Sequence, residues 1–115
     1  MANILGTHGK LGISYSVEFL TPGTKTVVKS VTSSADEAQI GGGINDTIDA
    51  GTYDLKFRNL GASTSKMVTY ATRWNGVGFE HMLRKRIVKS GRTTTYKNVN
   101  VSESGGISFV PNFVF

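Results

Sequence analysis

One stretch of the sequence concentrates positive charge among residues that can bind a polyanion. The stretch HMLRKRIVKSGRTTTYKNVNV, residues 81–101, carries six basic side chains and no acidic one. Lysine and arginine neutralise phosphates and release counterions, threonine and asparagine form hydrogen bonds with bases, and a tyrosine ring offers a stacking surface. This chemistry predicts a nucleic-acid-binding face, with RNA favoured over DNA, formed by Arg84, Lys85, Arg86, Lys89, Arg92, Tyr96 and Lys97.

The same residues are compatible with other interpretations. The charged side chains can simply line a solvated β-hairpin, with Tyr96 and Trp74 packed in the core or at its rim. In a second interpretation the indole of Trp74 stacks on the C–H face of a sugar, with Tyr70, Asn75 and acidic loop residues beside it, as in a lectin-like domain. Attraction to an acidic membrane is the weakest interpretation, and we expect no membrane partner.

Catalytic and metal-binding patterns are weak. The absence of cysteine excludes disulfides, zinc–thiolate sites and cysteine nucleophiles, and His8 and His81 lack the spacing of a metal site. Acidic residues between positions 36 and 54 lack EF-hand spacing, so turn capping explains them better than calcium binding. We therefore expect no enzyme, no metal and no cofactor, with a ribonuclease site built from His81, Glu80 and Arg84 as a weak alternative.

Length and charge describe one domain with a basic second half. A chain of 115 residues forms a single domain, residues 1–115. Residues 1–57 have a charge balance of −2 and residues 58–115 a balance of +7, which suggests a two-faced molecule or a partner for the basic half. The N-terminus lacks the pattern of a signal peptide, and no apolar run is long enough for a spanning helix. We therefore expect a virion or cytoplasmic location.

Alternation of apolar and polar residues with a period of two runs through the chain, which is typical of strands with one buried face. Residues 13–33 predict a hairpin whose strands are ISYSVEFL and KTVVKSVTS, joined by the turn TPGT. TIDAGTYDLKFRN and KMVTYATRW continue the pattern. In TTTYKNVNV, the period places Tyr96 and Asn98 on one face and Lys97 and Val99 on the other.

Three segments are less regular. A helical turn over residues 35–40, stopped by the glycine loop 41–43, is predicted from a capping-box pattern. Residues 79–89, FEHMLRKRIVK, fit both a helix and a strand, and their β-rich context favours a strand. Pro111 places the last strand at an edge or a bend. The chain is thus predicted to be all-β and mainly antiparallel, a β-sandwich, jelly roll or small barrel of seven or eight short strands with at most one real helix.

The apolar C-terminal segment GGISFVPNFVF supplies the candidate subunit interface. An apolar edge strand invites pairing with a neighbour, so Phe109, Phe113 and Phe115 are predicted to join copies of the chain, with a core-facing last strand as the alternative. The low charge content, the basic face and this segment favour a non-enzymatic, self-assembling structural protein that binds nucleic acid, such as a small virion or phage coat protein. A cytosolic, lectin-like carbohydrate-binding β-sandwich is the alternative.

Overall fold

Strands make up the regular structure of the chain. The computed structural model describes residues 1–7, 14–33 and 43–114, and within them it contains twelve strands in three sheets and no helix. The predicted all-β, mainly antiparallel class is confirmed. The predicted helical turn at residues 35–40 and most of the glycine loop lie outside the described residues.

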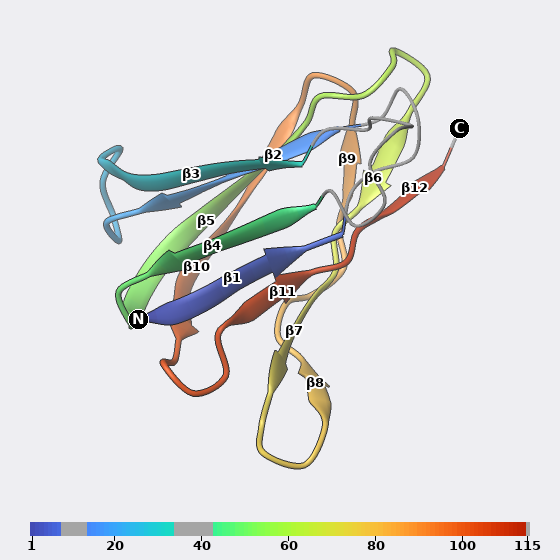
Figure 1. The fold of residues 1–115 in the computed structure, drawn as a ribbon. Coiled ribbons are helices and arrows are strands. Elements are labelled where there is room, and N and C mark those ends of the chain that lie inside the picture. The colour runs from blue at the N-terminus through green and yellow to red at the C-terminus, as the bar shows by residue number, and fades with distance from the viewer. Residues whose placement is uncertain (8–13, 34–42, 115) are drawn as a thin grey trace.

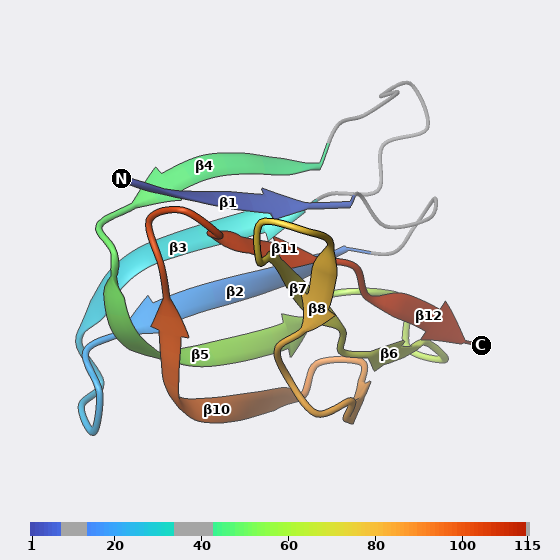
Figure 2. The same cartoon turned by 90° about the horizontal axis from the view of Figure 1, so that it is seen from below.

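Two larger sheets stack face to face, and a third, smaller sheet lies at one end (Figure 1, Figure 2). The antiparallel first sheet, of order β10-β5-β2-β3, consists of β2 (Tyr15–Leu20), β3 (Val27–Ser33), β5 (Gly51–Asn59) and β10 (Thr93–Val101). The second, of order β4-β1-β11-β7-β8, consists of β1 (Ala2–Gly6), β4 (Ile44–Ile48), β7 (Ala71–Trp74), β8 (Phe79–His81) and β11 (Ile107–Phe109). The third, of order β12-β6-β9, consists of β6 (Lys66–Val68), β9 (Ile87–Lys89) and β12 (Asn112–Val114).

Aromatic rings from both larger sheets meet in the core. Phe57 of β5 and Phe109 of β11 meet edge to face, with ring centroids 5.3 Å apart and an interplanar angle of 88°. Phe19 of β2 lies 6.1 Å from the same Phe109 ring, and all three rings are fully buried. Burying each ring contributes about 1.5–3 kcal/mol, and edge-to-face contacts add to that. The alternation read from the sequence of β2 and β5 therefore places their apolar faces correctly.

The strands outnumber the predicted seven or eight because three predicted strands are each divided in two, and because β1 and most of β4 lie outside the predicted strand segments. KMVTYATRW becomes β6 and β7 with a break at Thr69, and the C-terminal strand bends at Pro111 into β11 and β12. Residues 79–89 form no helix but become β8 and β9, with residues 82–86 between them. There the N–H of Arg86 donates to Thr69 Oγ1 and the N–H of Thr69 donates to the carbonyl of Arg86, both at 2.9 Å. These bonds replace a regular ladder.

A β-bulge interrupts β10 opposite the middle of β5. Tyr96 and Val99 keep their partners in β5, whereas Lys97 and Asn98 both lie opposite Asp54. Asn98 has a φ of +54°, in the left-handed region that asparagine tolerates better than most residues. The extra residue shifts the alternation, so Tyr96 and Val99 are buried and Lys97 and Asn98 are exposed. The prediction that Asn98 shares a face of the strand with Tyr96 is wrong, and so is the prediction that Val99 shares a face with Lys97.

Phe109→Ala should lower the free energy of unfolding by about 3–5 kcal/mol, because it removes a buried ring and leaves a cavity between the two larger sheets. Urea unfolding followed by circular dichroism measures the loss. Phe79→Ala is the matched control, because Phe79 is 70% exposed and its removal should change stability by less than about 0.5 kcal/mol. Equal losses in the two variants would contradict this account of the core.

Candidate nucleic-acid interface

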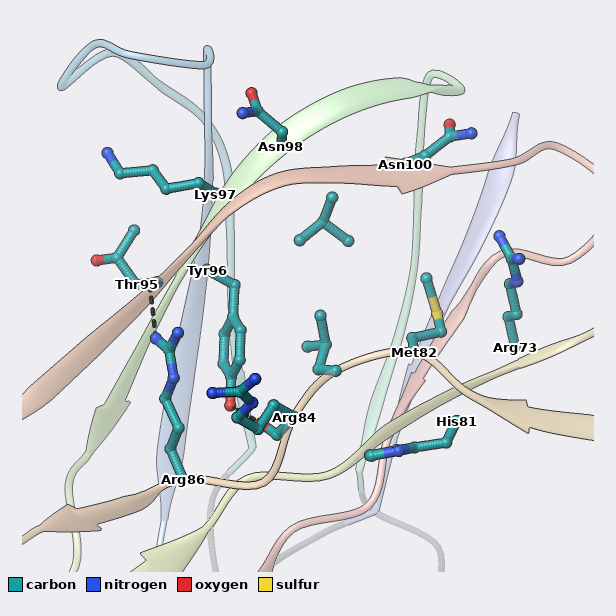
Figure 3. Close-up of a pocket in the computed structure, with 12 residues that line it drawn as sticks. Arg73, His81, Met82, Arg84, Arg86, Thr95, Tyr96, Lys97, Asn98 and Asn100 are labelled. Atoms are coloured by element: carbon teal, nitrogen blue, oxygen red, sulfur yellow. Dashed lines mark hydrogen bonds between the residues drawn. The ribbon is translucent and has the colours of Figure 1, made fainter.

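A hollow of about 550 Å³ opens between β10 and the segment that joins β8 to β9 (Figure 3). We call this hollow the basic groove. Residues 81–84 and Arg86 form one wall, residues 95–100 form the other, and Arg73 of β7 lies at one end. The bulge in β10 and the irregular segment 82–86 thus create the recess together.

Cations line the basic groove, and no carboxylate of the described residues does. Arg84 and Arg86 come from one wall and Lys97 from the other (Figure 3). Neither arginine forms an ion pair with any residue that the structure describes. Because a recess lined by one sign of charge focuses the electric field, the groove attracts anions.

The basic groove also offers apolar and hydrogen-bonding surfaces. Leu83 and Val99, which line it, are buried side chains, and Met82 packs beside them at the edge of the core. The amides of Asn98 and Asn100 lie on the β10 wall (Figure 3). An apolar floor with a few polar groups on the rim is the usual composition of a ligand pocket, and here it suits a planar group attached to an anion.

Tyr96 extends from β10 and contacts the residues that form the opposite wall of the groove. Its side chain is 6% exposed, and its hydroxyl lies 2.5 Å from Thr69 Oγ1 and donates to the carbonyl oxygen of Arg84. The Arg86 guanidinium lies over the ring, 4.2 Å from the centroid, and donates to the carbonyl of Thr95 at 2.8 Å. Figure 3 shows this link across the groove. Tyr96 therefore positions both arginines, and its ring is not the open stacking surface that the sequence suggested.

The buried carboxylate of Asp54 holds the β10 wall. Its Oδ1 accepts a hydrogen bond from the N–H of Asn98 at 2.9 Å, and its Oδ2 accepts one from the N–H of Gly23 at 3.0 Å. Lys97 Nζ lies 3.4 Å from Oδ2. These partners, above all the N–H of Asn98, lower the pKa of Asp54 below its ordinary value. The carboxylate thus ties the bulge to the turn between β2 and β3.

The groove gathers four of the seven predicted binding residues, with Tyr96 buried and the others exposed: Arg84, Arg86, Tyr96 and Lys97. Sequence reasoning missed Arg73 and Asn100. Arg73 reaches the groove because β7 pairs with β8, and its guanidinium binds the carboxylate of Glu80. Asn100 faces outward because the bulge reverses the alternation before it. No local pattern in the sequence signals either placement.

The remaining three predicted residues lie outside the groove. Lys85 Nζ lies over the ring of Tyr70, 5.0 Å from its centroid, and that ring stacks on His81 at 4.9 Å. Lys89 and Arg92 flank the turn between β9 and β10, where the N–H of Arg92 donates to the carbonyl of Lys89. The basic stretch is therefore split between the groove and the end of the third sheet.

The residues of the alternative sugar and ribonuclease sites have other partners. Asn75 Oδ1 accepts the N–H groups of the β7–β8 turn, and the half-exposed Trp74 packs edge to face on Phe79. Glu80 binds Arg73, which lowers its pKa, and His81 stacks against an aromatic ring. No group of described residues could hold a metal ion, and none of the described segments is a helix of membrane-spanning length. His8 lies outside the described residues.

The C-terminal phenylalanines differ in their surroundings. Phe109 is buried in the core of the chain itself, as in the core-facing alternative. Phe113 is half-buried, and its ring lies 6.3 Å from that of Tyr15. Phe115 lies outside the described residues. Of the three predicted interface residues, only Phe113 is described with part of its ring accessible to a neighbour.

Tyr96→Phe should lower the free energy of unfolding by about 1–3 kcal/mol, because the Arg84 carbonyl and the Thr69 hydroxyl lose a buried partner. Denaturant unfolding measures the change. Tyr70→Phe is the control, since the Tyr70 hydroxyl forms no hydrogen bond with the described residues; we expect its effect to stay below about 0.5 kcal/mol. A Tyr96→Phe variant as stable as the control would refute the positioning role.

Asp54→Asn should reduce the acid sensitivity of the fold. The folded-state pKa of Asp54 lies below its ordinary value of 3.8, so its stabilising contribution is complete above that value and is lost as the pH falls through the folded-state pKa. Thermal unfolding at pH 6 and pH 3 should show a smaller drop in Tm for the variant than for the natural protein. Asp46→Asn should have less effect, because Asp46 pairs with Lys29 in a more exposed setting. Equal drops for all three proteins would argue against this role.

Comparison of the chain with models of protein families, with curated proteins and with solved structures found no match in any of the three. The functional interpretation therefore rests on the groove itself.

Proposed function

We propose that this protein is a non-enzymatic, self-associating structural protein that binds nucleic acid in the basic groove, as the coat protein of a small virion would. The observation that carries the proposal is the lining of the groove. It includes Arg84, Arg86 and Lys97 and no carboxylate of the described residues, and the two arginines have no ion-pair partner among those residues, whereas Lys97 Nζ lies 3.4 Å from Asp54 Oδ2. Neutralising phosphates with such side chains releases counterions and is a main source of affinity for nucleic acid.

The amides on the groove wall support RNA as the ligand. Asn98 and Asn100 present both donors and acceptors beside the cations. The 2′-hydroxyl of RNA is also both a donor and an acceptor, and it distinguishes RNA from DNA at a binding site. A recess with an apolar floor also suits bases that are not held in a duplex.

Exposed apolar side chains support self-association. Trp74, Val77 and Phe79 are exposed on the β7–β8 hairpin, which extends away from the sandwich in Figure 1. Ile87 and Val114 are exposed on the outer side of the third sheet. Aromatic residues are enriched in protein interfaces, and exposed apolar patches commonly mark them. These residues complement Phe113 as candidate subunit contacts.

Arg84→Ala and Lys97→Ala should each weaken RNA binding and flatten its salt dependence. Each phosphate contact to a single strand contributes about 0.7 to the slope of log K against log[salt], so each variant should lose about that much. Fluorescence anisotropy with a labelled oligonucleotide, titrated at several salt concentrations, measures the slope.

Lys66→Ala is the control, because Lys66 lies in β6, outside the groove. Size-exclusion chromatography with light scattering, read at 260 and 280 nm, reports assembly and bound nucleic acid in one run. A monomeric protein that is free of nucleic acid and binds no added RNA would overturn the proposal.

A further inference from the structure

A second hollow, of about 380 Å³, borders the β10 bulge at Lys97. It is formed by the β2–β3 turn and by side chains of β2, β3, β5 and β10. Thr95 and Lys97 line both this hollow and the basic groove. The two recesses therefore meet at these side chains of β10.

The second hollow adds cations to those of the groove. Lys25 from the turn and Lys56 from β5 line it together with Lys97. It also contains two carboxylates, Glu18 and Asp54. Asp54 is almost fully buried and already accepts two backbone N–H groups, so it presents little charge at the surface.

Glu18 faces Lys56 across the ladder between β2 and β5, but no ion pair joins them in the described part of the chain. Lys25 likewise has no ion-pair partner among the described residues. Lys25 and Lys56 thus remain available to an external anion, whereas Lys97 Nζ lies 3.4 Å from Asp54 Oδ2. Because the second hollow also holds two carboxylates, its field is weaker than that of the basic groove.

Two adjoining recesses fit a single strand better than a duplex. Proteins read duplex DNA by inserting an element into its grooves, whereas here the cationic side chains surround concave surfaces. Single-stranded nucleic acid follows a positively charged channel, with its bases against apolar or aromatic side chains, over about 4–16 nucleotides for one small β-barrel domain. Lys97, at the junction, is placed to neutralise a phosphate between the two recesses.

We propose that the two hollows form one continuous track for single-stranded RNA, which crosses β10 at Thr95 and Lys97. This inference rests on the proposed function and deepens it. Nucleotides in the basic groove contact Arg84, Arg86 and the asparagine amides, and the strand continues toward Lys25 and Lys56. Affinity therefore depends on the length of the oligonucleotide.

The test compares labelled oligouridines of three and twelve nucleotides by fluorescence anisotropy. The trimer fills one recess, whereas the dodecamer reaches both. Lys25→Ala/Lys56→Ala should leave trimer affinity nearly unchanged and lose several-fold in dodecamer affinity, with a salt slope lower by about 1.4 because two phosphate contacts are removed. A longer oligonucleotide also binds more tightly because it can occupy the site in more positions, but this gain in affinity is the same for the natural protein and the double alanine variant. The difference in dodecamer affinity between the two proteins therefore reports the contribution of the two lysines.

Two control variants separate the track from bulk charge and from misfolding. Lys66→Ala removes a positive charge outside both hollows and should keep the length dependence. Lys25→Arg/Lys56→Arg keeps both charges and should bind the dodecamer as the natural protein does. A matching thermal unfolding curve for each variant confirms that the fold is retained.

The outcomes distinguish the track from the proposed function. If the natural protein binds both oligonucleotides but the double alanine variant loses no dodecamer affinity, the track is wrong and the basic groove alone binds RNA. If a duplex of equal length binds as tightly as the single strand, or if Lys66→Ala matches the loss per lysine, the single-strand track is also wrong. If the natural protein binds neither oligonucleotide, the proposed function itself fails.

Discussion

The buried carboxylate of Asp54 is the interaction on which the surface of this protein depends. Its oxygens accept the N–H groups of Asn98 and Gly23, which belong to β10 and to the β2–β3 turn. A carboxylate in such a position is costly unless its oxygens are bonded, so the bulge and the carboxylate stabilise each other. The bulge then lets Tyr96 and Val99 both point inward and turns Lys97 and the asparagines toward solvent.

Tyr96 links the bulged strand β10 to the irregular segment 82–86 on the other side of the groove. Once the ring is buried against Phe57, at a centroid distance of 5.5 Å, its hydroxyl reaches the carbonyl of Arg84 and its face supports the guanidinium of Arg86. The core and the basic groove therefore share a residue. Packing that stabilises the sandwich also fixes the cations, which reduces the entropy that they would lose on binding a ligand.

Some cationic side chains of this protein form ion pairs within the chain, whereas others have no such partner among the described residues. Arg73 and Lys29 are each bound to a carboxylate, Glu80 and Asp46. The first pair joins the paired strands β7 and β8, and the second joins β3 and β4, the edge strands of the two larger sheets. Arg84 has no such partner among the residues that the structure describes. Leaving like charges close together without compensation opposes folding. This contrast favours a role for the groove that lies outside the stability of the chain.

Sequence alone was sufficient for the class of fold and for most of the regular strands, although it did not predict β1. The alternation in β2 and β5, the turn at Pro22 and Gly23 and the bend at Pro111 are local signals, and each matches the structure. The sequence also located the basic stretch that supplies most of the groove. It could not place Phe109 in the core, Arg73 in the groove or Asn98 on the outside. Asn98 lies outside because of its bond to Asp54, 44 residues away. Arg73 reaches the groove because β7 pairs with β8, and Phe109 reaches the core because β11 pairs with β1 and β7. Pairing between such distant segments is decided by tertiary packing, because a period-two pattern carries no information about where a bulge will interrupt it.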